Sequence, residues 1–287
     1  MASTAPDPAV ELLRRVADMK LLPEAAIRVR DIANDPDAST TDLADAAGLD
    51  PMLSARVLRM ANSSVFNRGT PVTSLRRAVS VLGFARTRNL ALGMAMVAIG
   101  DRKLKYRSRL WAHTTSVAAA TAQLARFVKD VDPQTAFLGG LLHDLGVQVL
   151  LALAPDDELG LLARWPDGDP RLLKGERDRF GFDHARVGGL VADQYGLPSV
   201  VADAIRLHHQ IRVHPGRLVM PGARLAAAVA LAERLVQLTE RGMPAPNVAG
   251  TVSMDPLAKP LGVSKASLQV AAEVFEEEAK ALQSMLD

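Results

Sequence analysis

One apolar run limits what this chain can fold into, because it contains two ionisable groups. The run reads LGGLLHDLGVQVL from Leu138 to Leu150 and places His143 beside Asp144. The surrounding leucines and valines predict burial, and buried groups of this kind need hydrogen-bond partners or a metal ion. Any fold must therefore enclose the run and also supply partners for the pair.

The rest of the sequence favours helices over strands. Alanine and leucine dominate, aromatic residues make up only 4% of the 287 residues, and no segment alternates apolar and polar residues convincingly. Helix-starting signals recur, such as Ser39 followed by Asp42, and Asp50 followed by Pro51. We therefore predict an all-α fold, a two-lobed helical bundle.

Breaks in the helical pattern divide the chain into three parts. We expect an N-terminal helical lobe over residues 1–100, a basic linker over 101–109, and a second helical lobe with a C-terminal helix over 110–287. One helix should start at Asp132 and Pro133 and carry the whole apolar run. The segment 241–260 is rich in proline, glycine and asparagine and predicts a loop.

Composition excludes several kinds of protein. Without cysteine the chain has no disulfide, no thiolate metal site and no cysteine nucleophile. The opening residues MASTAPDPAVELLRR lack the basic and then apolar pattern of a signal peptide. The longest uninterrupted apolar run, Leu90 to Ile99, is too short to cross a bilayer. We expect a cytoplasmic protein.

Positive charge is concentrated in one part of the chain, although the net charge is only +2. Between Pro51 and Lys129 the only acidic residue is Asp101. This basic band either attracts an anion such as nucleic acid, a nucleotide or an acidic protein face, or covers helix surfaces and pairs with acids elsewhere. The candidate anion- or partner-binding residues are Arg56, Arg59, Arg76, Arg77, Arg86 and Arg88.

Part of the basic band has the layout of a helix-turn-helix. The segment TTDLADAAGLDPMLSARVLRMAN predicts a short helix, a turn at Gly48, and a second helix that bears Arg56 and Arg59. The second helix begins with proline, methionine and leucine, where a recognition helix needs polar groups for base edges. We therefore favour simple helix packing for this segment.

Side chains that can bind a metal ion follow one another through the second lobe, each on or at the end of a predicted helix. A helical bundle can direct such residues into one cavity. Histidine and carboxylate ligands together suit iron, manganese, zinc, nickel or magnesium, and such ions hydrolyse phosphoesters by activating water. The candidate ligands are His113, His143, Asp144, His184, His208, His209 and Glu233.

Ordinary structural roles remain open for the same residues. His143 and Asp144 can form a hydrogen-bonded pair that fixes helix packing. His208 and His209 are favourable near a helix C-terminus because of the helix dipole. His113 can pack in the core as an ordinary histidine, and His184 can face solvent in the first turn of a helix. His214 fits no pattern and is expected at the surface.

The order H…HD…H…HH resembles that of the HD superfamily of metal-dependent phosphohydrolases, which includes the HD-GYP cyclic-dinucleotide phosphodiesterases. The chain as a whole more closely resembles the HDOD family, a regulatory branch of that superfamily. The resemblance covers roughly residues 21–237 and implies a bacterial signalling module that acts through protein partners, usually without catalysis. The segments that carry it are LPEAAIRVRDIANDPDAST, DPMLSARVLRMANSSVFN, PVTSLRRAVSVLG, LGGLLHDLG and FDHARVGGLVADQYGLP.

Two departures from the HD-GYP pattern bear on catalysis. Those enzymes carry a lysine shortly after the HD pair, where this chain has Val147, and their GYP segment is missing here. A lysine at that position would supply a cation for the substrate phosphate, so its loss argues against turnover. The last ligand of the pattern, normally aspartate, is assigned to Glu233.

These features are compatible with three functions. The first is a non-catalytic HDOD-type module of signal transduction that acts through protein contacts. The second is a metal-dependent phosphohydrolase or phosphodiesterase of a nucleotide or cyclic dinucleotide, in which Asp144 bridges the metal or orients the attacking water. The third is nucleic-acid binding through the basic band, residues 51–129. We expect no membrane partner.

Overall fold

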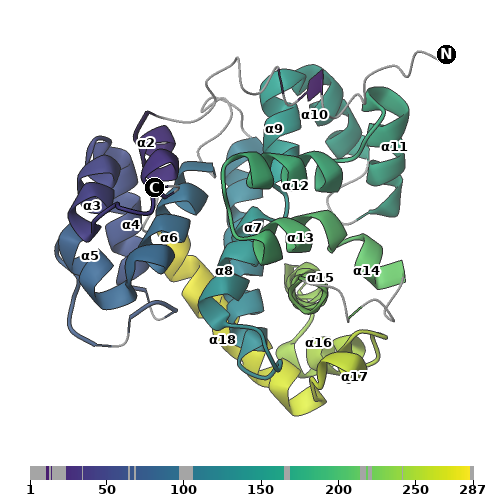
Figure 1. The fold of residues 1–287 in the computed structure, drawn as a ribbon. Helices are drawn as coiled ribbons and strands as arrows, with labels where there is room; N and C mark the ends of the chain where they lie inside the picture. The colour runs from purple at the N-terminus through teal and green to yellow at the C-terminus, as the bar shows by residue number, and fades with distance from the viewer. Residues whose placement is uncertain are drawn as a thin grey trace.

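Figure 1 shows an all-helical protein, which confirms the predicted fold class. The structure is a computed structural model and describes residues 11–12, 14, 24–33, 35–63, 65–67, 69–96, 106–164, 169–213, 218, 222–240 and 242–284. Of the predicted features, His214 and residues 101–105 of the basic linker lie outside these residues.

The N-terminal part of the chain folds into a lobe whose helices begin at the predicted caps. The Ser39 side chain accepts a hydrogen bond from the Asp42 amide while Asp42 accepts one from the Ser39 amide, which is a capping box. Asp50 accepts from the amides of Met52 and Leu53 at the start of the next helix. The helices of this lobe are α2 (Glu24–Ala33), α3 (Thr40–Gly48), α4 (Pro51–Ala61), α5 (Leu75–Leu82) and α6 (Phe84–Met96).

The remaining helices form the larger lobe, at the centre and right of Figure 1. Its long helix α7 begins at Tyr106, so the last four residues of the predicted linker are helical. The helices of this lobe are α7 (Tyr106–Ala125), α8 (Pro133–Leu142), α9 (Leu145–Leu153), α10 (Pro155–Arg164), α11 (Pro170–Phe180), α12 (His184–Gln194), α13 (Ser199–Leu207), α14 (Gln210–Val213), α15 (Ala223–Glu240), α16 (Ala245–Val252), α17 (Ala258–Leu261) and α18 (Lys265–Ser284).

The predictions for two segments of the second lobe are wrong. The segment 241–260, predicted as a loop, contains α16 and most of α17, whose apolar residues Val248, Val252 and Ala258 are buried in the core. Tertiary burial here outweighs the weak helix propensity of a segment rich in proline and glycine. The single helix predicted across the apolar run is two helices, α8 and α9.

The two lobes share one continuous apolar core, which runs from Leu12 to Leu282. The segment 133–153 is apolar enough by length and composition to cross a membrane, but its most apolar 18-residue window is 89% buried inside the protein. The last helix, α18, runs back along α7 toward the N-terminal lobe (Figure 1). Glu278 on α18 accepts a 2.6 Å hydrogen bond from Gln123 on α7. The core helices α7, α8 and α9 are thereby enclosed on several sides, and the site lies among them.

Candidate metal centre

The His143–Asp144 pair lies at the junction of α8 and α9. His143 is the last residue with helical backbone angles before the junction, and Asp144, with φ −96° and ψ 23°, leaves the helical path. Neighbouring side chains on a continuous helix diverge by about 100°. The break lets them turn toward each other, and His143 Nε2 lies 2.9 Å from Asp144 Oδ2.

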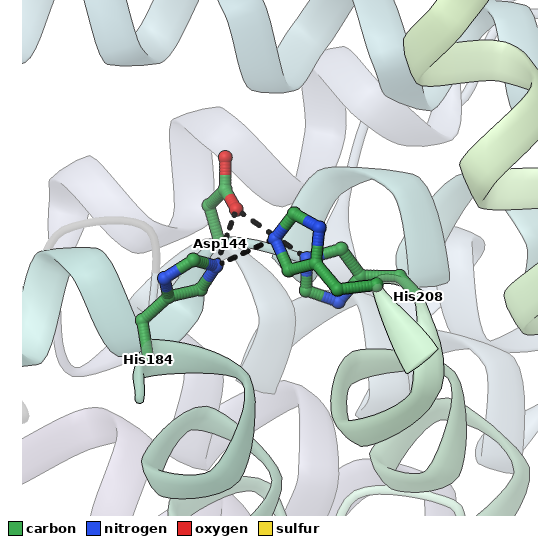
Figure 2. Close-up of side chains that lie close together, drawn as sticks. Asp144, His184 and His208 are labelled. Carbon is green, nitrogen blue, oxygen red and sulfur yellow. Dashed lines mark hydrogen bonds and ion pairs between the residues drawn. The ribbon is translucent and has the colours of Figure 1, made fainter. Parts of the chain in front are cut away.

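Three more helices bring imidazoles to the same carboxylate, and Figure 2 shows two of these side chains, His184 and His208, beside Asp144. Asp144 Oδ1 lies 3.6 Å from His184 Nε2 and 3.8 Å from His208 Nε2. Asp144 Oδ2 lies 3.8 Å from His113 Nε2. His209 lies beside His184, with its Nε2 3.0 Å from that of His184. Six of the seven predicted ligands therefore converge, and they do so around Asp144.

The converging atoms form two groups that share Asp144. One contains Asp144, His184, His208 and His209, and the other contains His113, His143 and Asp144; within each group the donor atoms lie within 4.8 Å of one another. Ligands about 2 Å from a common ion lie roughly 3 to 4 Å from each other. The spacing fits one divalent ion in each group, with the Asp144 carboxylate between them.

Backbone carbonyls fix the tautomer of two of the imidazoles. His143 Nδ1 lies 2.7 Å from the Gly140 carbonyl and His208 Nδ1 lies 2.6 Å from that of Ile205. A carbonyl only accepts, so each Nδ1 carries the proton and each Nε2 of a neutral ring is a lone-pair donor. This is how metal-binding histidines are commonly oriented.

These lone pairs meet no hydrogen-bond donor in the described part of the chain. His143 Nε2, Asp144 Oδ2 and His208 Nε2 are buried and make no hydrogen bond of normal geometry with the described residues. The lone pair of a neutral imidazole and a carboxylate oxygen 2.9 Å away repel each other unless a cation lies beside both. The arrangement thus calls for a cation, either a proton or a metal ion.

Glu176 on α11 is a buried residue of the site that the sequence analysis did not single out. Its two carboxylate oxygens lie 2.8 and 2.9 Å from His184 Nδ1, and one also accepts the His184 backbone N–H at 2.8 Å. Such a carboxylate orients a histidine ligand and increases its basicity. The available sequence signal was its spacing, because Glu176 lies four residues after the buried Leu172 on the inner face of α11.

The buried charges of the site are predominantly negative. Asp144, Glu158, Glu176 and Glu233 are at most 3% exposed, whereas no lysine or arginine among the described residues is buried. Burying carboxylates without a counter-cation is costly. A divalent ion held by histidines would balance them, so the donor set and the charge both fit a metal.

The pKa values show how the fold balances this charge with protons. Burial alone would lower the pKa of His184, but Glu176, then Asp144 and Glu158, raise it to about 10. Burial would raise the pKa of Asp144, but the imidazoles, His143 foremost, hold it well below its usual range. Burial lowers the pKa of His208 to about 4. Protonated His184 thus stabilises the metal-free fold fully below about pH 6.5, and this contribution is lost as the pH rises toward 10.

A comparison with protein families identifies the fold. The model of the HDOD domain matches residues 19–211, which is more than half of the chain. The chain belongs to the HDOD family. The match ends within α14, so α15 and α18 of this HDOD protein lie outside it.

Relatives match the HDOD protein at low sequence identity. An uncharacterised protein of Treponema pallidum is 23% identical over 206 residues, which covers 71% of this chain and 40% of the relative. The chain thus spans less than half the length of that curated relative. A Shewanella amazonensis protein, named provisionally as a phosphohydrolase, is 23% identical with a TM-score of 0.75, and the match covers 96% of this chain and 98% of the other.

A third relative of the HDOD protein is from Marinobacter aquaeolei and is named provisionally as a signal transduction protein. It is 24% identical with a TM-score of 0.65, and the match covers 98% of this chain and 64% of the other. At these identities the solved structures support the all-helical fold of the HDOD protein and nothing beyond the fold.

The seventh predicted ligand of the HDOD protein, Glu233, is buried on α15 but belongs to neither ligand group. Its Oε1 accepts a 2.9 Å hydrogen bond from Gln237, one turn along the helix. It acts electrostatically on His208, whose pKa it tends to raise. Its role as a ligand therefore stays a prediction.

The candidate arginines of the HDOD protein lie on its N-terminal lobe. Arg76 pairs with Asp45 at 3.3 Å, Arg86 lies 3.9 Å from Asp132, and Arg88 donates to Asn89. Arg56 and Arg59 are partly buried on α4, where Arg59 donates to the Ala55 carbonyl, and Arg77 is exposed. At the start of α4 the exposed side chains include Leu49 and Met52, which present no hydrogen-bonding group to a base edge. Nucleic-acid binding stays an untested prediction.

We expect Glu176→Gln to flatten the pH dependence of metal binding by the HDOD protein. In the wild-type protein an ion must displace the proton that His184 holds with a pKa of about 10. Affinity should therefore rise about tenfold per pH unit between about pH 7 and pH 9. Glutamine keeps an acceptor oxygen but removes the charge, so the slope should fall, and affinity at the high-pH end should fall about 10- to 100-fold.

Calorimetric titration with Mn²⁺ across this pH range measures both the slope and the affinity. Glu277→Gln, at an exposed position of α18, is the matched control and should behave like the wild type. An unchanged slope in Glu176→Gln would show that this carboxylate does not govern the proton on His184.

Proposed function

We propose that this HDOD protein is a bacterial, cytoplasmic signalling module that binds a divalent metal in its buried centre and acts through a protein partner without hydrolysing a substrate. The observation that carries the proposal is the burial of four of the six converging ligands. His143, Asp144, His184 and His208 are at most 3% exposed. A hydrolytic metal needs an open coordination position for water and substrate, whereas a sensory or structural ion is served by a closed one.

The position of Val147 supports the same proposal. Its side chain is fully buried in a small apolar cluster with Leu110, Leu151, Leu162 and Leu172. A substrate phosphate would need a cation near the metal, and here the corresponding position is filled by packing between α9, α10 and α11. This packing joins the site to the outer helices α10 and α11, a route by which an ion could alter the surface that a partner contacts.

A metal-dependent phosphohydrolase is the second candidate, favoured by the two ligand groups that share Asp144. Two ions bridged by a carboxylate are an arrangement that stabilises the attacking and leaving oxygens of a phosphoester. His209 is partly exposed and gives this group a side open to solvent. In that case Asp144 would hold the ions and orient the attacking water.

One experiment separates the two candidates. Untagged protein is purified without oxygen from cells supplemented with manganese and iron, and its metal content is measured. It is then assayed against linear and cyclic dinucleotides. We expect bound metal and no turnover; turnover that disappears in Asp144→Asn would establish the phosphohydrolase instead. Protein without metal under these conditions would contradict both.

A further inference from the structure

One face of α15 carries polar side chains along a helix that is otherwise mostly apolar. Glu233, Gln237 and Glu240 follow one another at helical spacing, so they lie on the same side of the helix. Glu233 is buried, Gln237 is partly buried, and Glu240, the last residue of the helix, has a side chain that is 54% exposed. The polar face therefore leads from the interior of the lobe to its surface, and Glu240 lies at the outer end.

Glu240 lies beside His113, a candidate ligand on α7. Its Oε1 is 3.9 Å from His113 Nδ1, while His113 Nε2, on the other side of the same ring, is 3.8 Å from Asp144 Oδ2. The ring thus has one nitrogen toward the metal centre and the other toward Glu240. A separation of 3.9 Å is longer than a direct hydrogen bond, and a small rotation of the exposed glutamate side chain or one bridging water is enough to close it.

The other three imidazoles around Asp144 have the same arrangement. Each directs its Nε2 toward Asp144 and has an oxygen next to its Nδ1. These oxygens, at 2.6 to 2.8 Å, are the Gly140 carbonyl for His143, the Ile205 carbonyl for His208 and the Glu176 carboxylate for His184. An acceptor at Nδ1 holds the proton there and leaves the Nε2 lone pair for an ion. Glu240 is the oxygen acceptor beside Nδ1 of the fourth imidazole, His113.

Helix stability does not explain a glutamate at this position. A carboxylate at the C-terminal end of a helix is disfavoured by the helix dipole. Among the described residues Glu240 forms no ion pair with a lysine or arginine that would offset this effect, and its electrostatic partner is His113. The contact with the imidazole is therefore the interaction that the carboxylate serves.

We propose that Glu240 is a positioning residue of the metal centre, which accepts a hydrogen bond from His113 Nδ1 when an ion binds at Nε2. The inference rests on the proposed function, because it takes the buried centre to hold a metal. It concerns the group of His113, His143 and Asp144, which has three protein ligands where the other group has four. Since Glu240 is exposed, the affinity of this group depends on a residue that a protein partner can contact.

Calorimetric titration with Zn²⁺ tests the proposal, together with NMR spectra of the Zn²⁺-loaded protein labelled with ¹⁵N-histidine. We expect one ion in each ligand group. Glu240→Ala should lower the affinity for the weaker ion about 10- to 100-fold and leave the tighter one unchanged. Glu240→Gln keeps an acceptor oxygen and should recover part of this loss. The Nδ1 proton of His113 should be visible in the wild type and should exchange faster with water in Glu240→Ala.

Glu277→Ala is the matched control, since Glu277 is an exposed glutamate on α18, and it should bind both ions like the wild type. Metal-free Glu240→Ala should unfold at the wild-type Tm, because the substituted side chain lies at the exposed end of α15. Equal affinities in Glu240→Ala and Glu277→Ala, or an equal loss at both metal positions, would overturn the inference and leave the proposed function intact. Wild-type protein that binds no Zn²⁺ would contradict the proposed function and the inference with it.

Discussion

Asp144→Asn is expected to lower divalent-metal affinity by more than about 100-fold. Asp144 is the only residue shared by the two ligand groups among the described residues, and it is the carboxylate on which four imidazoles converge. Asparagine keeps the size and one oxygen but loses the charge that balances the ion. Loss of an outer partner such as Glu176 costs about 10- to 100-fold, and loss of a direct ligand should exceed this.

Metal content and calorimetric affinity for Mn²⁺ measure this effect, and circular dichroism checks that the variant is folded. Asp178→Asn is the matched control, because Asp178 is exposed on α11 and pairs with Lys174 at the surface. It should retain the wild-type affinity. If Asp144→Asn binds Mn²⁺ as tightly as Asp178→Asn, the ion is not held at this carboxylate.

Gly146→Ala is expected to destabilise the fold by about 3 kcal/mol or more. A Cβ atom at Gly146 would lie 1.9 Å from the His184 carbonyl oxygen and 2.6 Å from its carbon. Both atoms are backbone at the start of α12, so they cannot rotate away, and α9 and α12 would have to separate. His184 would move with α12, so metal affinity should fall as well.

Thermal unfolding of the metal-free protein measures the stability change, which corresponds to a lower Tm of roughly 6 °C or more. Gly160→Ala is the control, since Gly160 lies within α10 and a Cβ there meets nothing within 4 Å. That variant should be as stable as the wild type or slightly more stable. A Tm for Gly146→Ala equal to that of Gly160→Ala would disprove the close approach of the two helices.

Local signals in the sequence were sufficient for much of the fold. Ser39 and Asp50 each cap a helix as predicted, because N-caps depend on neighbouring backbone amides. The break at His143 could not be predicted in this way. No proline lies between Pro133 and Pro155 to mark a break, and the break is stabilised by the convergence of distant helices on Asp144, which periodicity does not reveal.

Most residues of the candidate site could be predicted from the sequence, but their arrangement in space could not. The order of the histidines indicated a common pocket, and the resemblance to a known family reinforced it. Glu158 and Glu176 were missed, because each is a glutamate on a charged helix that happens to point inward. Only the packing of α10 against α9 and α11 distinguishes them from exposed glutamates.

The docking of α18 along α7 has a consequence for how the protein matures during synthesis. Helix α7 carries His113 and is covered by residues such as Glu278 and Gln283, which are made more than 150 positions later, as the separations of 155 and 171 residues in their hydrogen bonds show. Until the ribosome has released α18, one face of α7 stays open to water. The centre should therefore acquire its ion only after α18 has left the ribosome, and a gene truncated at residue 211, where the family match ends, should yield a chain that depends on chaperones and aggregates.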